Sequence, residues 1–161
     1  SSREGLLDSQ EHRRLTQTLA TVQRTVADVL IPFSLLTTVP ANTTLGDIEH
    51  AVRQTGFSRF PLSTEDGKLV GYLHVKDVLE LLDQPPETPV PPASVRPLPE
   101  VASTARLDVA LALLRRSQSH LALISAPDGR TEGVVALEDL VEEYVGTVRD
   151  ATHVATPPLP C

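Results

Sequence analysis

The amino-acid sequence predicts an α/β fold in which two similar units pack as a pseudo-two-fold pair. Three observations support this class: an internal repeat, an alternation of strand-like and helix-like segments in each copy, and a proline-rich stretch between the copies. A unit of roughly 60 residues is too small to bury a full core alone. We therefore expect two small three-stranded sheets to pack against each other, with helices flanking them.

The repeat is clearest in two apolar segments that begin with glycine and end in a helix-like run. "GYLHVKDVLELL", which begins at Gly71, aligns with "GVVALEDLVEEYV", which begins at Gly133. Asp77 then pairs with Asp139, and both pairs lie 62 positions apart. Upstream, "VPANTTL" matches "VASTARL" at the same separation, and an amphipathic helical stretch follows each.

Each unit is predicted to run strand, helix, strand, Asp-Gly turn, strand and helix. "SRFPL", which begins at Ser58, pairs with "SHLAL", which begins at Ser119, after a slip of one residue. Both strands lead into an Asp-Gly turn, at residues 66–67 and 128–129. Asp-Gly between two apolar runs is typical of a hairpin, so each unit should contain one.

The remaining segments complete the predicted domain organisation. Seven of the fourteen prolines lie between residues 83 and 100, and proline fixes the backbone and removes a donor, which indicates an extended linker. Leu15, Leu19 and Val22 recur at helical spacing and indicate a lead-in helix. We expect a lead-in helix at 1–24, a first repeat at 25–84, a linker and the start of the second repeat at 85–100, the second repeat at 101–149, and an extended or disordered tail at 150–161.

Composition excludes several classes of function. The formal charge of -7, the absence of a Lys or Arg run, and the content of two Tyr and three Phe argue against nucleic-acid binding. Cys161 is the single cysteine, so no internal disulfide is possible, and a cytosolic setting fits best. The longest uncharged run, residues 29–46, is interrupted by Pro32 and Pro40, so we expect this piece to be soluble without spanning a membrane.

The two paired aspartates lie where a strand gives way to a helix. A carboxylate in the first turn of a helix gains about 0.3 to 1 kcal/mol from the helix dipole, which is a sufficient structural role for either residue. It can also accept both hydroxyls of a ribose, and Gly71 and Gly133 would leave room for a ligand. Arg59 is then the candidate for phosphates, with a surface salt bridge as the structural alternative.

The paired units resemble a tandem cystathionine-beta-synthase (CBS) domain module. Its loose signature of glycine, apolar residues, Ser or Thr, two variable residues and Asp or Asn is similar to "GYLHVKD" and "GVVALED". "TVADVLIP", "SRFPL", "SHLAL" and "GVVALEDLVEEYVG" also resemble the CBS pair of the CorC and cyclin M (CNNM) magnesium and cobalt transporter family, also called hemolysin-like. The resemblance covers about residues 6–149.

The resemblance implies a regulatory module on the cytoplasmic face of the cell membrane, attached to the membrane domain of a longer chain. Family members bind an adenine nucleotide, ATP or AMP with or without Mg²⁺, in the cleft between the repeats. They form homodimers, and nucleotide state is coupled to transport. The alternative is a ligand-free dimerisation module of the same transporter.

The resemblance also implies two clefts of unequal quality. The better cleft would use Ile31, Ser58, Arg59, Pro61, Ala136, Glu138 and Asp139. Asp139 would bind the ribose, Arg59 the phosphates, Ser58 and Pro61 would form the wall, and Glu138 would lie near the phosphates or a magnesium ion. The poorer cleft would use His74, Asp77, Ser119 and His120, with no arginine matching Arg59.

Two residues of the better cleft depart from the family pattern. Members often have a hydroxyl residue at the place of Ala136, and some have one at the place of Ile31. A neutral hydrogen bond is worth roughly 0.5 to 1.5 kcal/mol, so losing two would weaken binding up to about a hundredfold.

Catalysis and metal binding have weaker support. Ser119, His120 and Asp139 are residue types that a hydrolase uses, including a free-standing nucleotide hydrolase, but such residues are common and no Gly-x-Ser-x-Gly nucleophile motif is present. The five histidines have no short ligand spacing and no cysteine support, so we expect no metal site. Glu142 and Glu143 are assigned to a solvated helix face.

Overall fold

The computed structural model describes residue 11 and residues 24–155 of the 161-residue chain. Of the lead-in helix expected at 1–24, only Glu11 and Arg24 are among the described residues, and Glu11 is helical. The final residues of the expected tail, 156–161, also lie outside the described part of the chain.

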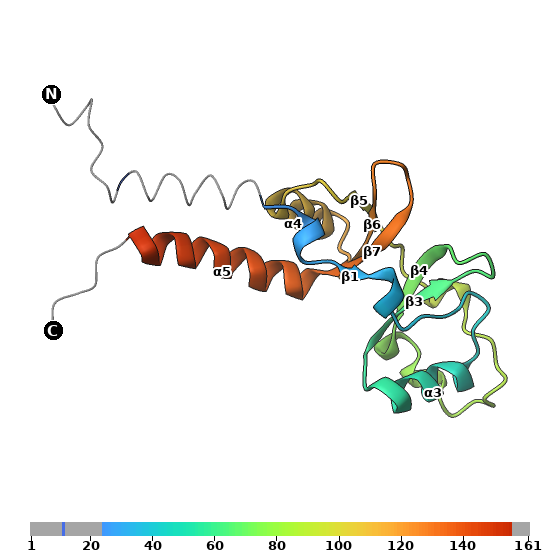
Figure 1. Cartoon of the computed structure of the whole chain (residues 1–161). Helices are drawn as coiled ribbons and strands as arrows, with labels where there is room; N and C mark the ends of the chain where they lie inside the picture. Colours follow the sequence, from blue (N-terminus) through green and yellow to red (C-terminus); the bar gives the residue numbers. More distant parts are fainter. Residues whose placement is uncertain (1–10, 12–23, 156–161) are drawn as a thin grey trace, which may run out of the picture.

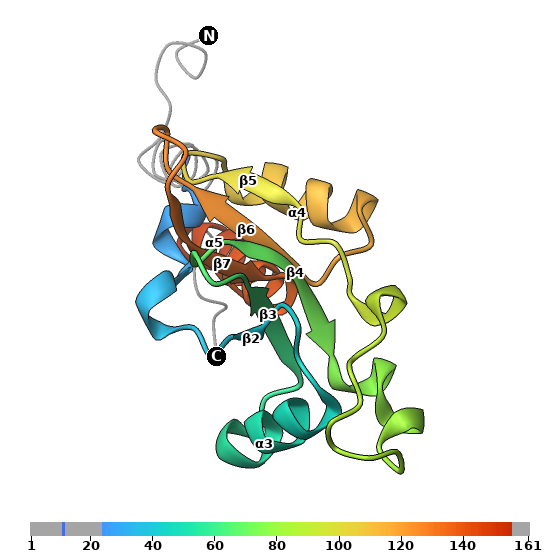
Figure 2. The ribbon, with the colours of Figure 1, turned by 90° about the vertical axis from the view of Figure 1, so that its right-hand side faces the viewer.

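Two small sheets form the centre of the molecule, which confirms the predicted α/β class (Figure 1). The first sheet has the order β2-β3-β4, with β2 at Val39–Pro40, β3 at Arg59–Ser63 and β4 at Leu69–His74. The second has the order β1-β7-β6-β5, with β1 at Ile31–Pro32, β5 at Glu100–Ala102, β6 at Leu121–Ser125 and β7 at Thr131–Ala136. The second sheet therefore has four strands where three were expected, because β1 joins it. Figure 2 shows the β3–β4 hairpin lying next to the β6–β7 hairpin.

In the described range 24–155, three α-helices flank the sheets: α3 at Leu45–Thr55, α4 at Leu107–Arg116 and α5 at Leu137–Ala155. Thr44 caps α3, since its hydroxyl accepts from the Asp47 backbone N–H at 3.2 Å while the Asp47 carboxylate accepts from the Thr44 N–H at 3.1 Å. Helix α5 extends away from the sheets (Figure 1).

Short 3-10 turns connect the other elements: η1 at Val26–Asp28, η2 at Phe33–Leu35, η3 at Val75–Asp77, η4 at Leu79–Leu81 and η5 at Pro92–Ser94. The helix expected at the end of the first unit is thus wrong, since η3 and η4 replace it. A helix there would run into Pro85 and Pro86, which disfavour helical backbone before them. Its counterpart α5 meets no proline before Pro157 and continues to Ala155, so residues 150–155 are helical rather than extended.

The sheet register corrects the one-residue slip inferred from the sequence. Arg59 lies opposite His74, and Leu121 lies opposite Ala136, so the separation of 62 continues through the hairpins. The backbone N–H of Val75 donates to Ser58, as that of Leu137 donates to His120, each at 2.8 Å. The structural counterpart of Arg59 is therefore Leu121 and not His120. The Asp-Gly turns also keep this separation, and a slip would turn every side chain to the opposite face.

The two units exchange their leading segments. Val26 is buried in the core of the second unit with Val101, Leu107, Ala110, Leu114, Ala122, Ile124, Val135 and Leu140. Val90, from the linker, is buried in the core of the first unit with Val39, Leu45, Ile48, Phe60, Leu62, Leu73 and Val78. Each core therefore needs a segment that precedes the other unit. The unit boundaries at 25–84 and 101–149 stay predictions.

Gly71 and Gly133 make room for the chain itself rather than for a ligand. A Cβ on Gly133 would overlap the carbonyl oxygen of Ile31 in β1. A Cβ on Gly71 would lie 2.7 Å from Val95 Cγ1 and 2.8 Å from the carbonyl oxygen of Arg96. Both glycines thus allow an exchanged segment to approach the sheet closely.

Candidate functional site

A cavity of about 300 Å³ opens where the two units meet. Five of the seven residues expected for the better cleft line it: Ile31, Ser58, Arg59, Pro61 and Ala136. Strands β1, β3 and β7 contribute them, because β1 crosses to the second sheet and brings its residues toward β3. The two sequence units therefore build one cavity together.

The charged wall of the cavity is Arg59. Its guanidinium Nη2 lies 3.3 Å from Glu138 Oε1, and its side chain is 27% exposed. Its Nε atom is buried without a hydrogen-bond partner among the described residues. The cation in the cavity wall suits an anionic ligand through the part of its guanidinium that remains exposed.

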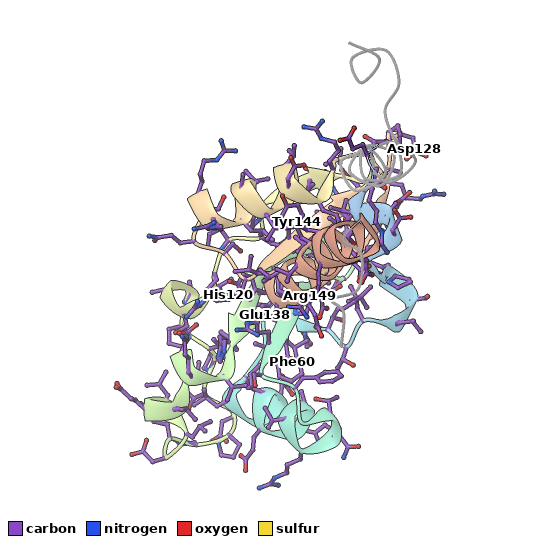
Figure 3. All side chains as sticks on the ribbon, turned by 90° about the vertical axis from the view of Figure 1, so that its left-hand side faces the viewer. Phe60, His120, Asp128, Glu138, Tyr144 and Arg149 are labelled. Carbon is purple, nitrogen blue, oxygen red and sulfur yellow. The ribbon has the colours of Figure 1, made fainter. Side chains whose placement is uncertain are left out.

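Glu138 links Arg59 to His120. Its Oε1 lies 3.1 Å from His120 Nδ1, and Figure 3 shows the two side chains next to each other. Partial burial disfavours the ionised form of Glu138. The backbone N–H at the start of α5, the His120 hydrogen bond and the Arg59 charge outweigh that effect, so the pKa of Glu138 lies below its ordinary value. The side chain of His120, a residue expected in the poorer cleft, thus lies beside Glu138, and its role in a binding site stays a prediction.

Asp139 lies in the first turn of α5, where it is exposed. It does not line the cavity, in contrast to its neighbour Glu138, which contacts Arg59. The structure therefore brings six of the seven expected residues together and leaves Asp139 beside them. Its role in binding a ribose stays a prediction.

The residues expected for the poorer cleft form contacts with other residues of the chain. His74 Nδ1 accepts from the Lys76 backbone N–H at 3.1 Å. Burial, followed by the charges of Arg59, Lys76 and Arg96, lowers the pKa of His74 below its ordinary value. Ser119 is 3% exposed, and its hydroxyl donates to the Leu121 carbonyl at 2.7 Å.

Asp77 has the strongest of these contacts. Arg96 donates to its carboxylate from Nε at 2.7 Å and from Nη2 at 2.8 Å. These hydrogen bonds are the main reason that the pKa of Asp77 lies below its ordinary value, and they raise that of Arg96. This ion pair was not predicted from the sequence, because Arg96 lies in the proline-rich linker, away from the repeated motifs.

Sequence reasoning also missed part of the cavity wall. The missed lining residues are Leu35, Leu36, Thr37, Phe57, Leu121 and Val134. Phe57 is 55% exposed and Leu35 is 72% exposed, so the mouth of the cavity carries apolar groups that could contact an aromatic base. Phe57 precedes Ser58 directly, and an aromatic residue beside a predicted site residue was the available signal.

Within the described residues, no helix has both the length and the apolar character needed to cross a bilayer. The same part of the chain holds no cluster of three or more His, Cys, Asp or Glu side chains arranged for a metal ion.

Comparison with known proteins gives the family context. Residues 26–84 match the CBS domain family. An uncharacterized protein of Mycobacterium tuberculosis (strain H37Rv) is 49% identical over 155 residues, which are 93% of this chain and 45% of that protein. The magnesium and cobalt efflux protein CorC of Escherichia coli (strain K12) is 28% identical over 151 residues, 93% of this chain and 52% of CorC. The chain thus spans about half the length of these curated relatives.

Solved structures extend the match to both units. The CBS domain of a bacterial CNNM/CorC family Mg²⁺ transporter in complex with ATP has a TM-score of 0.73 and 27% sequence identity, and the match covers 85% of this chain and 98% of that one. The same domain in complex with the inhibitor IGN95a has a TM-score of 0.72 at 27% identity, with 89% and 90% covered.

Residues 26–84 thus match a CBS domain, and the fold of both units together is that of solved CBS domain structures. More closely, it is similar to the CBS domain of bacterial CNNM/CorC family transporters, in agreement with the resemblance seen in the sequence.

Proposed function

We propose that the chain is a regulatory CBS pair that binds an adenine nucleotide in the cavity between its two units. The observation that carries the proposal is Arg59, a partly exposed cation in the wall of this cavity. The CBS domain solved with ATP supports it, because that domain shares the fold at 27% identity. The polar and apolar parts of the wall match the two parts of a nucleotide.

In the proposed complex, the apolar wall receives the base and Arg59 receives the phosphates. Ile31, Val134 and Ala136 form a surface without charge, while Arg59 lies at the side of Glu138. Glu138 is ionised and already neutralises Arg59, so it competes with a phosphate for the guanidinium. A magnesium ion on the phosphates would offset the repulsion between them and Glu138.

The nucleotide would act by shifting the relative orientation of the two units. A ligand that contacts β1, β3 and β7 at once favours the arrangement in which these strands are closest. The lead-in segment at 1–24 would transmit the change to a membrane domain in a longer parent chain, on its cytoplasmic face. The role is regulatory and not catalytic, and the transport of magnesium or cobalt would belong to the parent protein.

Calorimetric titration with ATP, ADP and AMP, with and without Mg²⁺, tests the proposal. We expect binding that Arg59→Ala weakens and that Ala136→Thr strengthens by up to about tenfold, since it adds one hydroxyl at the wall. Asp139→Ala should weaken binding, while Asp77→Ala should not. If no nucleotide binds at millimolar concentration, the proposed sensing function fails, and phosphate release from ATP would contradict a non-catalytic role.

A second candidate is a ligand-free homodimerisation module. Val141, Val145 and Val148 recur along α5 and are each at least 40% exposed. Val141 and Val145 also line a groove of about 340 Å³ with Leu111, Leu137 and Tyr144. Sedimentation should then show a dimer that Val145→Glu converts to a monomer, whereas Val70→Glu, at an exposed position in the first unit, should leave the mass unchanged.

A further inference from the structure

The internal repeat gives the proposed nucleotide cavity a counterpart in a second cavity. A smaller cavity of about 210 Å³ is lined by Tyr72, Arg96, Pro97, Ser117, Gln118 and Ser119. Ser119 stands 62 positions after Phe57, and Tyr72 stands 62 positions before Val134, both of which line the larger cavity. The two cavities are therefore related by the pseudo-two-fold symmetry of the repeat.

The exchanged segments complete the correspondence. Ile31 pairs with Val134, and Arg96 pairs with Tyr72. The carbonyl oxygen of Ile31 lies against Gly133 as that of Arg96 lies against Gly71. Arg96 and Tyr72 thus stand where the larger cavity has Ile31 and Val134. Two large polar side chains replace two aliphatic ones.

Both replacements fill space and use up the polar groups of the second cleft. Tyr72 is 1% exposed, and its hydroxyl accepts from the His120 backbone N–H at 3.0 Å, across the boundary between the units. Arg96 donates twice to Asp77, the residue that repeats Asp139. The arginine is held there by backbone hydrogen bonds with Tyr72 in both directions, at 2.8 and 3.0 Å.

We infer that Tyr72 and Arg96 are built-in occupants of the second cleft, so that one chain binds one nucleotide and not two. Tyr72 takes the place of a base, and the Arg96 guanidinium takes the place of a ligand on Asp77. The position equivalent to Arg59 is Leu121, which is buried, so the cation of the second cleft is Arg96, which already pairs with Asp77. The inference rests on the proposed function for the meaning of the first cleft, and its test separates the two.

The test is the stoichiometry of ATP and of AMP, measured by calorimetry on the whole chain. We expect one nucleotide per chain for the wild type. The double variant Tyr72→Val and Arg96→Ile installs the residues of the first cleft at these two positions and releases Asp77, so it should bind two nucleotides, the second more weakly because Leu121 stands at the position of Arg59. Arg130→Ile changes an exposed arginine outside both cavities and should leave the number at one.

Each outcome decides one of the two claims. Two nucleotides on the wild type, or no additional nucleotide on the folded double variant, would overturn the inference while the first cleft stands. No nucleotide on the wild type and one on the double variant would uphold the occupation of the second cleft by Tyr72 and Arg96 and remove the proposed function of the first cleft. Because Tyr72 is buried, Arg96→Ile alone is the second test. This substitution should raise the pKa of Asp77, which carbon NMR can follow. It should also allow a second nucleotide to bind, more weakly than the first. The absence of both changes would count against the inference.

Discussion

Arg96 and Asp77 form a two-point ion pair, with Nε and Nη2 of the arginine at 2.7 and 2.8 Å from the two carboxylate oxygens. The pair joins the proline-rich linker to the end of the first unit, 19 residues away in the sequence. Both side chains are mostly buried, at 27% and 22% exposure. It is therefore a tertiary contact that fastens the linker, as well as the contact that occupies Asp77.

Asp77→Asn should lower stability at neutral pH and make acid unfolding less steep. The pKa of Asp77 is lower in the folded state than in the unfolded state, so between these two pKa values the folded state binds fewer protons. The stabilisation that the Asp77 charge contributes is fully present above the unfolded pKa and is lost as pH falls through the folded pKa. Breaking a charged hydrogen bond costs about 1.5 to 3 kcal/mol. Urea unfolding at a series of pH values measures this, and an equal loss at pH 7 and at the acid end would contradict it.

Glu138→Gln should tighten the binding of magnesium-free ATP by about tenfold, which corresponds to about 1.4 kcal/mol. The change removes the carboxylate charge that lies 3.3 Å from Arg59 and would repel phosphates. Binding of adenosine, which has no phosphate, should not improve. Glu142→Gln, one turn further along α5 and outside the cavity, is the matched control. Equal effects of both substitutions on ATP affinity would show that the negative charge of the whole helix face repels ATP, and not Glu138 in particular.

Gly133→Ala should destabilise the chain by about 1 to 3 kcal/mol and weaken nucleotide binding. The new methyl group would overlap the carbonyl oxygen of Ile31, so β1 must move away from β7 and carry a wall of the cavity with it. Gly146→Ala is the control, because no neighbouring atom lies within 4 Å of a Cβ there and alanine favours the helix. Thermal unfolding and a nucleotide titration give the two measurements. Unchanged affinity in Gly133→Ala would show that β1 does not shape the site.

Gln118→Gly should stabilise the chain by up to about 1 kcal/mol. Gln118 has a φ of 51°, in the left-handed region, at the position where the first unit has Gly56 with a φ of 72°. Glycine adopts this backbone without the steric cost that glutamine bears. Gly56→Ala is the reverse substitution, and it should destabilise through backbone conformation alone, since no atom lies within 4 Å of its Cβ position. Denaturant unfolding compares the two, and a loss of stability in Gln118→Gly would refute the argument.

Much of the architecture could be predicted because the repeat consists of local sequence patterns. The Asp-Gly turns and the paired glycines predicted two hairpins at a separation of 62, and both exist. The one-residue slip was wrong because it aligned the serine that begins "SRFPL" with the serine that begins "SHLAL". The backbone hydrogen bonds, and not these serines, set the register of the strands. The helix expected after His74 was wrong because prolines further along the chain limit it.

The candidate site could be predicted in part. Ile31, Ser58, Arg59, Pro61 and Ala136 line one cavity, as the family resemblance implied. Phe57 and Leu35 were not identified, because exposure at the mouth of a cavity depends on the path of the chain and not on residue type. The contact of the His120 side chain with Glu138 was not predicted, because the two residues lie far apart in the sequence.

The sequence by itself determined that the chain contains two related α/β units, that a proline-rich segment joins them, and that paired aspartates follow their last strands. These properties arise from turns, periodicity and repetition, which act over short distances. Only the tertiary structure decided how unequal the two clefts are. Exchange of the leading segments puts Ile31 on one sheet and Arg96 on the other, and a contact between segments distant in sequence leaves no local pattern. The symmetry of the repeat is therefore a property of the sequence, and the asymmetry of its clefts is a property of the fold.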